Sequence, residues 1–228
     1  FLKPEYAYNL DLGINYKSLN AQTYLSFRTF ATVISRHIVR DDFIIFSDTT
    51  TADESTILYN GEEVTTIANK NLGNRFLHGF SIDGFSYFSK SLKLNGSFSY
   101  VKGDENETYG PMPSISPIFG SISGEYAKNK IKISAIYKFS GDKSPADYSL
   151  GGEDGLEETP IIIENSGRVR YAGTPKWSDF SVYTNYDISK DIKVRIALTN
   201  IFDNHYRPFA SGISAPGRSF QIGLYLKL

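Results

Sequence analysis

The chain has 228 residues, and its 24 Lys and Arg nearly balance its 25 Asp and Glu. This balance gives no overall field that would favour nucleic acid. Cys is absent, which excludes disulfides, thiolate metal sites and a Cys nucleophile. No apolar run approaches the roughly 18 residues of a transmembrane helix, and the first residues do not form a signal peptide. We therefore expect the chain to begin after any export signal, or never to have had one.

Alternation of apolar and polar residues with a period of two predicts strands along most of the chain. The clearest case is the segment 6–17, where Tyr, Leu and Ile alternate with Asn, Asp, Gly and Lys. Each such segment would place its large apolar groups on one face of a sheet. Nine segments are predicted, at about 6–17, 19–29, 80–88, 92–100, 118–126, 131–139, 180–186, 192–198 and 220–228.

Two classes of connection alternate between these segments. Tight polar turns are predicted at 17–20, 89–91, 127–130 and 189–191. Long loops are predicted at about 30–75, 101–117, 140–176 and 199–217. Short turns at one end and long loops at the other are typical of outer-membrane barrels, with the turns in the periplasm. Within the first loop, Asn60 and Gly61 predict a short extra hairpin.

Two further patterns favour a membrane barrel. The last apolar-face residue before each tight turn is aromatic, as in an interfacial girdle, at Tyr16, Phe88, Tyr126 and Tyr186. The opposite face carries charges in the middle of strands, as a wet lumen would, at Asp11, Asp83, Lys132 and Arg195. A soluble sandwich with one solvated face would also show alternation, so this alternative stays open here.

Strand parity predicts that the barrel is larger than this chain. If every tight turn joins a descending strand to an ascending one, the first and ninth strands both descend. A complete bacterial barrel has an even number of strands and both ends in the periplasm. We therefore expect an all-β fold: a transmembrane antiparallel up-and-down β-barrel, in which residues 1–228 form the C-terminal part of one domain of roughly 22 strands.

The end of the chain carries a specific motif. Residues 199–208 read Thr-Asn-Ile-Phe-Asp-Asn-His-Tyr-Arg-Pro and are followed by Ala-Pro-Gly-Arg at 215–218 and the final alternating strand. This stretch resembles the end of TonB-dependent receptors, as do Leu-Lys-Pro-Glu at 2–5 and Pro-Ile-Phe-Gly at 117–120. Residues 206–213 are most similar to members common in the Bacteroidetes, including haem and haemoglobin receptor types. The chain departs from the family in ending at Leu228 rather than at an aromatic residue.

The resemblance implies an activity for the complete protein. Such receptors lie in the outer membrane of Gram-negative bacteria and import a scarce nutrient, here an iron chelate or haem. A periplasmic TonB complex drives the import through a plug domain, and neither the plug nor the preceding strands are in this sequence. The implied partners are outer-membrane lipid, the TonB complex, a small-molecule nutrient and, in some members, a surface lipoprotein; no nucleic acid is expected.

Residues of the closing motif have a structural interpretation of their own. Asn200 and Asp203 can cap the end of the outgoing strand through bonds from side chain to backbone. Pro216 and Gly217 redirect the chain, and Arg218 starts the closing strand. We expect these residues to shape the last loop rather than to bind ligand.

No enzymatic constellation is present, and no resident cofactor is expected. His37, His78 and His205 are far apart in sequence and lack metal-ligand spacing, so we expect solvated loop residues. The acidic segment 151–158 lacks the spacing of a calcium loop and is expected to be solvated. If the outer loops bind haem or a chelate, the candidates by residue type are His37, Tyr109, Met112, His205 and Arg207, since His, Met and Tyr ligate haem iron and Arg pairs with carboxylates.

Other functions remain open at this point. A glycan or peptide importer that works with a surface lipoprotein would have the same wall. A structural or adhesive barrel, or a soluble β-sandwich that binds a partner, would also fit the alternation. An outer-membrane hydrolase or protease would need a catalytic cluster, which the sequence does not show.

Overall fold

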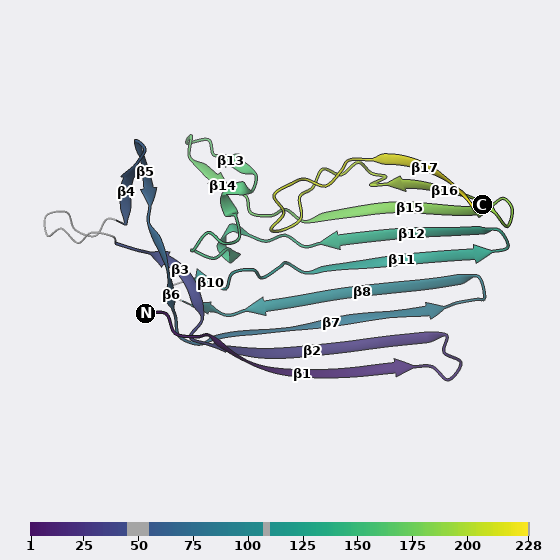
Figure 1. The fold of residues 1–228 in the computed structure, drawn as a ribbon, viewed down its shortest axis with the longest axis horizontal. Helices are drawn as coiled ribbons and strands as arrows, with labels where there is room; N and C mark the ends of the chain where they lie inside the picture. The colour runs from purple at the N-terminus through teal and green to yellow at the C-terminus, as the bar shows by residue number, and fades with distance from the viewer. Residues whose placement is uncertain (45–54, 107–109, 228) are drawn as a thin grey trace, which may run out of the picture.

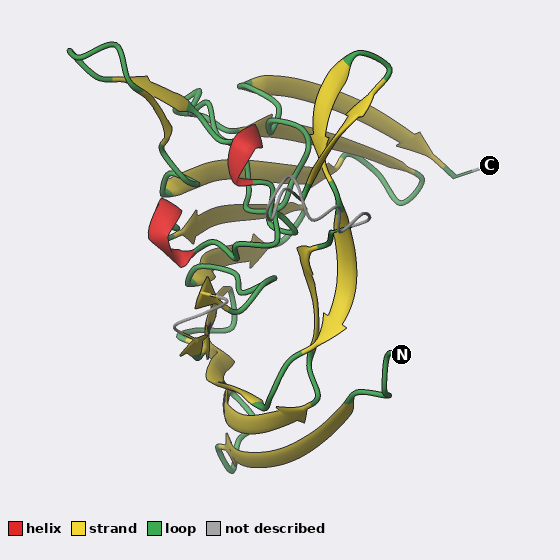
Figure 2. Ribbon diagram, turned by 90° about the vertical axis from the view of Figure 1, so that its left-hand side faces the viewer, coloured by secondary structure: helices red, strands yellow, loops and turns green. Residues whose placement is uncertain are grey.

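Nine strands form one antiparallel sheet in chain order (Figure 1). The computed structural model describes residues 1–44, 55–106 and 110–227. The strands are β1 (Tyr6–Lys17), β2 (Thr23–Ser35), β7 (Arg75–Tyr87), β8 (Leu92–Gly103), β11 (Phe119–Lys128), β12 (Ile131–Ser140), β15 (Trp177–Asp187), β16 (Ile192–Thr199) and β17 (Ser219–Leu226). The predicted all-β, up-and-down architecture is confirmed. Viewed from the loop end, the sheet follows an arc rather than a plane (Figure 2).

The second strand differs from its prediction at both ends. Ala21 has a φ of 54° and belongs to the turn, so β2 begins only at Thr23. At its other end β2 continues through Phe30 to Ser35, six residues beyond the predicted end at Thr29. Alternation is weak in that part, because Phe30 stands on the otherwise polar face, opposite Gly79. The missing side chain of Gly79 makes room for the Phe30 ring.

The register places large apolar residues in continuous rows across the sheet. One row runs through directly paired residues, namely Ile14, Phe27, Ile82, Phe98, Gly120 and Phe139. Aromatic rings of this face contact one another, as in the pair Phe80 and Phe98 with centroids 5.9 Å apart. Most of these side chains are exposed, with Ile14 at 71%. The apolar face is therefore covered by no other part of the described chain.

The opposite face is polar and hydrogen-bonded between strands. Ser97 and Ser121 share a hydrogen bond of 2.8 Å, and Lys132 lies 2.6 Å from Glu125. The charges predicted for this face are there, since Asp83 pairs in register with Ser97, and Arg195 with Gly223. Alternation thus correctly assigned the two faces.

Tight turns lie at one end of the sheet and long connections at the other (Figure 1). The predicted hairpin at Asn60 and Gly61 is confirmed as β4 (Thr56–Tyr59) paired with β5 (Glu62–Thr65), with φ of 52° and 88° at the turn. The loop end also contains β3 (Ile38–Asp42), β6 (Ile67–Asn71), β9 (Glu105–Asn106), β10 (Gly110–Pro111), β13 (Ile161–Ile163), β14 (Val169–Tyr171) and the 3-10 turns η1 (Pro145–Asp147) and η2 (Leu156–Glu158).

In the described part of the chain, no helix is long and apolar enough to cross a membrane.

Fully buried apolar side chains are concentrated away from the sheet. Among the described residues, the buried apolar side chains are Val39, Met112, Tyr148 and Ala197. Only Ala197 belongs to the nine-stranded sheet. The loop end is therefore a packed layer with a small core of its own, which we call the loop layer.

Candidate functional site

A buried ion pair lies at the centre of the loop layer. Lys143, three residues after β12, places its Nζ 2.9 Å from Oδ2 of Asp154, and the two side chains are 4% and 2% exposed. The same Nζ donates to the carbonyl of Ile115 at 2.7 Å. Oδ1 of Asp154 accepts from the backbone N–H of Ser114 at 2.7 Å. Three loop segments are therefore joined by one pair of charges.

Aromatic rings surround the ammonium of Lys143. Nζ lies 4.1 Å from the ring centroid of Phe209 and 5.0 Å from that of Tyr148. The hydroxyls of Tyr148 and Thr174 share a hydrogen bond of 2.7 Å. Burial raises the pKa of the Tyr148 hydroxyl, while the bond to Thr174 opposes that shift. Because four hydrogen-bonded or aromatic groups satisfy Lys143, it holds the loops together and is not available to a ligand.

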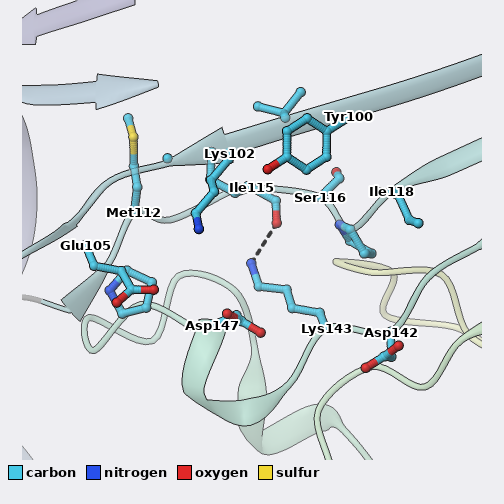
Figure 3. A pocket seen from close by; sticks show the side chains of 14 residues that line it. Tyr100, Lys102, Glu105, Met112, Ile115, Ser116, Ile118, Asp142, Lys143 and Asp147 are labelled. Carbon is cyan, nitrogen blue, oxygen red and sulfur yellow. Dashed lines mark hydrogen bonds between the residues drawn. The ribbon is translucent and has the colours of Figure 1, made fainter. Parts of the chain in front are cut away.

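A cavity of about 220 Å³ lies beside this pair (Figure 3). Its walls come from the end of β8, the segment 111–118 and the start of the following long loop. Charged side chains of both signs line it, at Lys102, Glu105, Asp142, Lys143 and Asp147. With both signs present, the lining suits a polar or zwitterionic group better than a simple anion.

A second buried cation anchors another loop segment. Arg75, at the start of β7, is 2% exposed and places its Nε 2.7 Å from Oδ1 of Asp104. Its guanidinium also donates to the carbonyls of Asp104 at 2.8 Å and Gly110 at 3.2 Å. The planar fork of an arginine suits this set of acceptors. Arg75 thereby fixes the path of the chain after β8.

A stacked aromatic pair closes the other side of the loop layer. Trp177, at the start of β15, and Tyr206 have ring centroids 4.4 Å apart and planes inclined by 16°. Burial raises the pKa of the Tyr206 hydroxyl, and the charge of Asp179, which accepts its hydrogen bond, adds to the effect. Trp177, Lys176 and His205 line an open cavity of about 530 Å³. The indole Nε1 of Trp177 is buried without a protein partner among the described residues.

The closing motif shapes the last loop, as predicted. Asn200 is 2% exposed and has a φ of 46°. Its amide donates to the carbonyls of Asn204 at 2.9 Å and Pro216 at 3.1 Å, and its carbonyl accepts from the backbone of Asn204 at 3.0 Å. Asp203 accepts from the backbone N–H of Arg218 at 2.7 Å. These bonds cross the loop and bring the closing strand into register.

Two expectations of solvated loop residues are wrong. His37 is 8% exposed, and its Nδ1 lies 2.9 Å from Oε2 of Glu5. The acidic segment 151–158 contains the buried Asp154, and Oε1 of Glu153 accepts from the backbone of Arg40 at 3.3 Å. Partners more than 30 residues away along the chain bind Nδ1 of His37 and Oε1 of Glu153, and short-range patterns carry no signal of such contacts. Nε2 of His37 is buried without a partner among the described residues. Within the described residues, no group of three His, Asp or Glu side chains could hold a metal ion.

The candidate ligand residues do not converge on one cavity. Met112 is 7% exposed and lines the cavity beside Lys143, whereas His205 lines the cavity beside Trp177. His205 is exposed and Arg207 half-buried. Burial raises the pKa of Tyr148, and the positive charge of Arg207 is a minor influence that opposes this rise. Tyr109 lies outside the described residues.

Sequence reasoning missed the residues that organise the loop layer. Lys143, Asp154 and Arg75 are ordinary charged residues in a chain that has 49 of them. Trp177 had a signal, since it is the one Trp of the chain and stands three residues before the predicted strand 180–186. An aromatic residue with one polar atom, placed where a strand enters the loops, can stack its ring on another side chain and also offer its N–H to a polar group.

The curved antiparallel sheet, with one exposed apolar face, one polar face and a packed loop layer at a single end, is the wall of a β-barrel. Residues 1–201 match the family of TonB-dependent receptor-like β-barrels. The chain belongs to this family. No curated protein matches the sequence.

Solved structures show the same fold. The copper transporter OprC superposes with a TM-score of 0.71 at 15% identity, covering 99% of this chain and 32% of that one. The siderophore receptor PirA from Acinetobacter baumannii gives 0.67 at 20% identity, with 99% and 32% covered. The FrpB iron transporter from Neisseria meningitidis gives 0.65 at 14% identity, with 98% and 31% covered. The chain thus spans about a third of the length of the receptors it resembles.

Proposed function

We propose that this chain forms part of the wall and the outer loops of an outer-membrane receptor that imports an iron chelate or haem with energy from a TonB complex. The family match over residues 1–201 carries the proposal. The exposed apolar face supports placement in a bilayer, since such a face would be a liability in water. Similar structures are described as copper, iron and siderophore transporters or receptors, which supports a metal-containing cargo.

The import step is tested with the full-length receptor in a host that lacks its own iron receptors. Uptake of radioactive iron, supplied as a siderophore complex or as haem, is measured with and without a functional TonB protein. We expect uptake that disappears without TonB. Uptake of a glycan or peptide instead of iron would overturn the ligand assignment, and a lipoprotein that co-purifies with the receptor would point to the same alternative.

For the cargo contacts we propose His205 and Arg207. The first is exposed beside a cavity, and the second carries the positive charge that a propionate or siderophore carboxylate requires. Replacing Arg207 by Ala should weaken cargo binding by about ten-fold or more, the usual effect of losing a hydrogen bond to a charged group. Met112 and Tyr109 stay weaker candidates, because one is buried and the other is not described.

Histidine variants separate the remaining candidates. His205→Ala should weaken haem binding by the intact receptor, as followed by the haem absorption band. His37→Ala should act on cargo less directly, because the Nδ1 of His37 is already bonded to Glu5. His78→Ala is the matched control, since His78 is exposed on β7 and stacks on Phe76 at 5.4 Å. If the His205 and His37 variants bind haem as well as the His78 control does, histidine is removed from the cargo site.

A further inference from the structure

The apolar face of the sheet contains a groove between β7 and β8. Gly84 and Gly96 stand directly opposite each other on the apolar face. The next pair on this face, Ile82 and Phe98, carries large side chains. The groove has a volume of about 470 Å³ and an almost wholly apolar lining. Its walls include Leu25, Ile82, Phe88, Leu94, Phe98 and Ile122.

The gap over Gly96 is left open, unlike that over a neighbouring glycine. At Gly120, one row further along, a Cβ would lie 2.8 Å from the ring of Phe139, so that ring already covers the position. At Gly84 a Cβ would collide with the backbone oxygen of Tyr24 and lie 2.8 Å from the side chain of Leu25, so Leu25 covers that position. At Gly96 the nearest atom would be 3.9 Å away. The open space of the groove therefore lies over Gly96, which no side chain of the described residues covers.

A cation stands at the turn end of the same groove. Lys90 is exposed in the turn that joins β7 to β8, next to Phe88. Exposed lysines flank the other tight turns, at Lys17, Lys128, Lys130 and Lys190. Asp191 is the acidic residue within these turns, and the nearby Asp187 lies 3.2 Å from Lys193. The turn end is thus a cationic rim, which we define by these four lysines and Lys90.

We propose that the groove and Lys90 bind an anionic phospholipid, with one acyl chain over Gly96 and the phosphate at the lysine. The proposal rests on the proposed function, because it needs the wall to lie in a bilayer. Tight turns of outer-membrane barrels face the periplasm, so the lipid belongs to the inner leaflet. A lysine near a membrane surface attracts anionic lipid, and apolar grooves take hydrocarbon.

Charge favours a lipid over a second copy of this chain. Two copies in one membrane share one orientation, so their cationic rims would lie side by side and repel each other. An anionic headgroup neutralises the same rim. Phe88 stands at the level of the girdle, where the headgroup region meets the hydrocarbon. The groove therefore lies at the membrane depth of the acyl-chain carbons nearest the headgroup.

Photochemical cross-linking tests the acyl-chain site. Full-length receptor is reconstituted into nanodiscs that contain phosphatidylglycerol with a diazirine on one acyl chain, and cross-linked residues are mapped by mass spectrometry. We expect cross-links concentrated on β7 and β8. Gly96→Phe should remove them, and Gly96→Leu provides a smaller filling if the first variant does not insert. Thr184→Phe, on the same face of β15, is the matched control and should leave them unchanged.

Comparison of headgroups tests the role of the lysine. Lys90→Gln should lower the yield of phosphatidylglycerol cross-links relative to phosphatidylcholine by about five-fold, the ratio for about 1 kcal/mol per lysine near an anionic surface. Lys190→Gln should not change the ratio in this groove. Even labelling around the wall, equal yields from both lipids, or protein–protein cross-links through the groove would each overturn the site. These outcomes leave iron uptake intact, whereas a receptor that stays in buffer without detergent would refute the proposed function itself.

Discussion

The wall and the loop layer of this protein are stabilised in opposite ways. In the wall, many strand pairs each contribute to stability, and rows such as Ile14, Phe27 and Ile82 form the exposed apolar face that we propose lies in a bilayer. In the loop layer, a few buried polar groups such as Lys143 and Arg75 each hold several segments. In the wall, the loss of stability on substitution should therefore depend on the face of the sheet that is changed. In the loop layer, it should depend on the single residue that is replaced.

The largest effect should come from the buried ion pair. Lys143→Met leaves the carboxylate of Asp154 buried without its partner, and we expect a loss of about 3–5 kcal/mol in the stability of the loop layer. Hydrogen exchange of residues 140–175 in the full-length receptor measures it as local opening. The matched control is Lys132→Met, because Lys132 is half exposed in its pair with Glu125 and should cost less than about 1 kcal/mol.

A double variant sharpens this comparison. Lys143→Met combined with Asp154→Leu removes both charges and should recover part of the protection, because two apolar groups need no partner. If the single and double variants exchange equally fast, the pair is not what holds the loops.

Charge on the apolar face should give the next largest effect. Ile122→Lys places an ammonium on the face that we propose meets lipid, and it should destabilise the folded barrel by about 2–4 kcal/mol near the middle of the membrane. Ser123→Lys, its neighbour on the polar face, should cost far less. Urea unfolding of the full-length receptor in lipid vesicles measures both. Equal losses would mean that the two faces do not meet different surroundings.

Asn200 should have a somewhat smaller effect. Asn200→Ala leaves backbone groups of Asn204 and Pro216 unpaired around a buried side chain, and we expect a loss of about 1–3 kcal/mol. Hydrogen exchange of residues 200–217 reports it. Asn20→Ala is the control, since Asn20 lies exposed in a tight turn. Faster exchange confined to the last loop would assign the motif to loop shape, and unchanged exchange would contradict that role.

The difference between the two regions also explains what the sequence could predict. Alternation is a local signal, so it assigned the strands, their faces and the turn end without knowledge of any partner. Residues of the closing motif were interpretable for the same reason, since the side chain of Asn200 bonds only within 16 residues of its own position. The end of β2 was missed because Phe30 breaks alternation and depends on Gly79, which is 49 positions away.

Contacts of the loop layer had no comparable signal. Lys143 and Asp154 are separated by 11 residues of irregular chain, and Arg75 bonds to Asp104 across a whole strand pair. Residue type indicated His37 and Met112 as candidate ligands, but it could not show that both side chains are buried, His37 beside Glu5 and Met112 in the core. Chemistry read from residue types is thus least certain where loops fold on themselves.

The smallest expected effect is a titration at the edge of the loop layer. Burial, with the charge of Asp179 as a lesser cause, raises the pKa of Tyr206 above its ordinary value of 10.0. A raised pKa means that the neutral hydroxyl is favoured in the folded state, so its contribution to stability is complete below about pH 10 and is lost as the pH rises through the raised value. The difference in absorbance at the tyrosinate band between the receptor and its Tyr206→Phe variant isolates this group.

Comparison of folded and unfolded receptor completes that titration. In urea the difference curve should return to the ordinary midpoint of a free tyrosine, because neither burial nor Asp179 acts on an unfolded chain. Asp179→Asn should lower the midpoint only in part, since burial is the larger cause. A folded midpoint at the ordinary value would show that Tyr206 is solvated and not stacked on Trp177, and the last loop would then lack the anchor that joins it to β15.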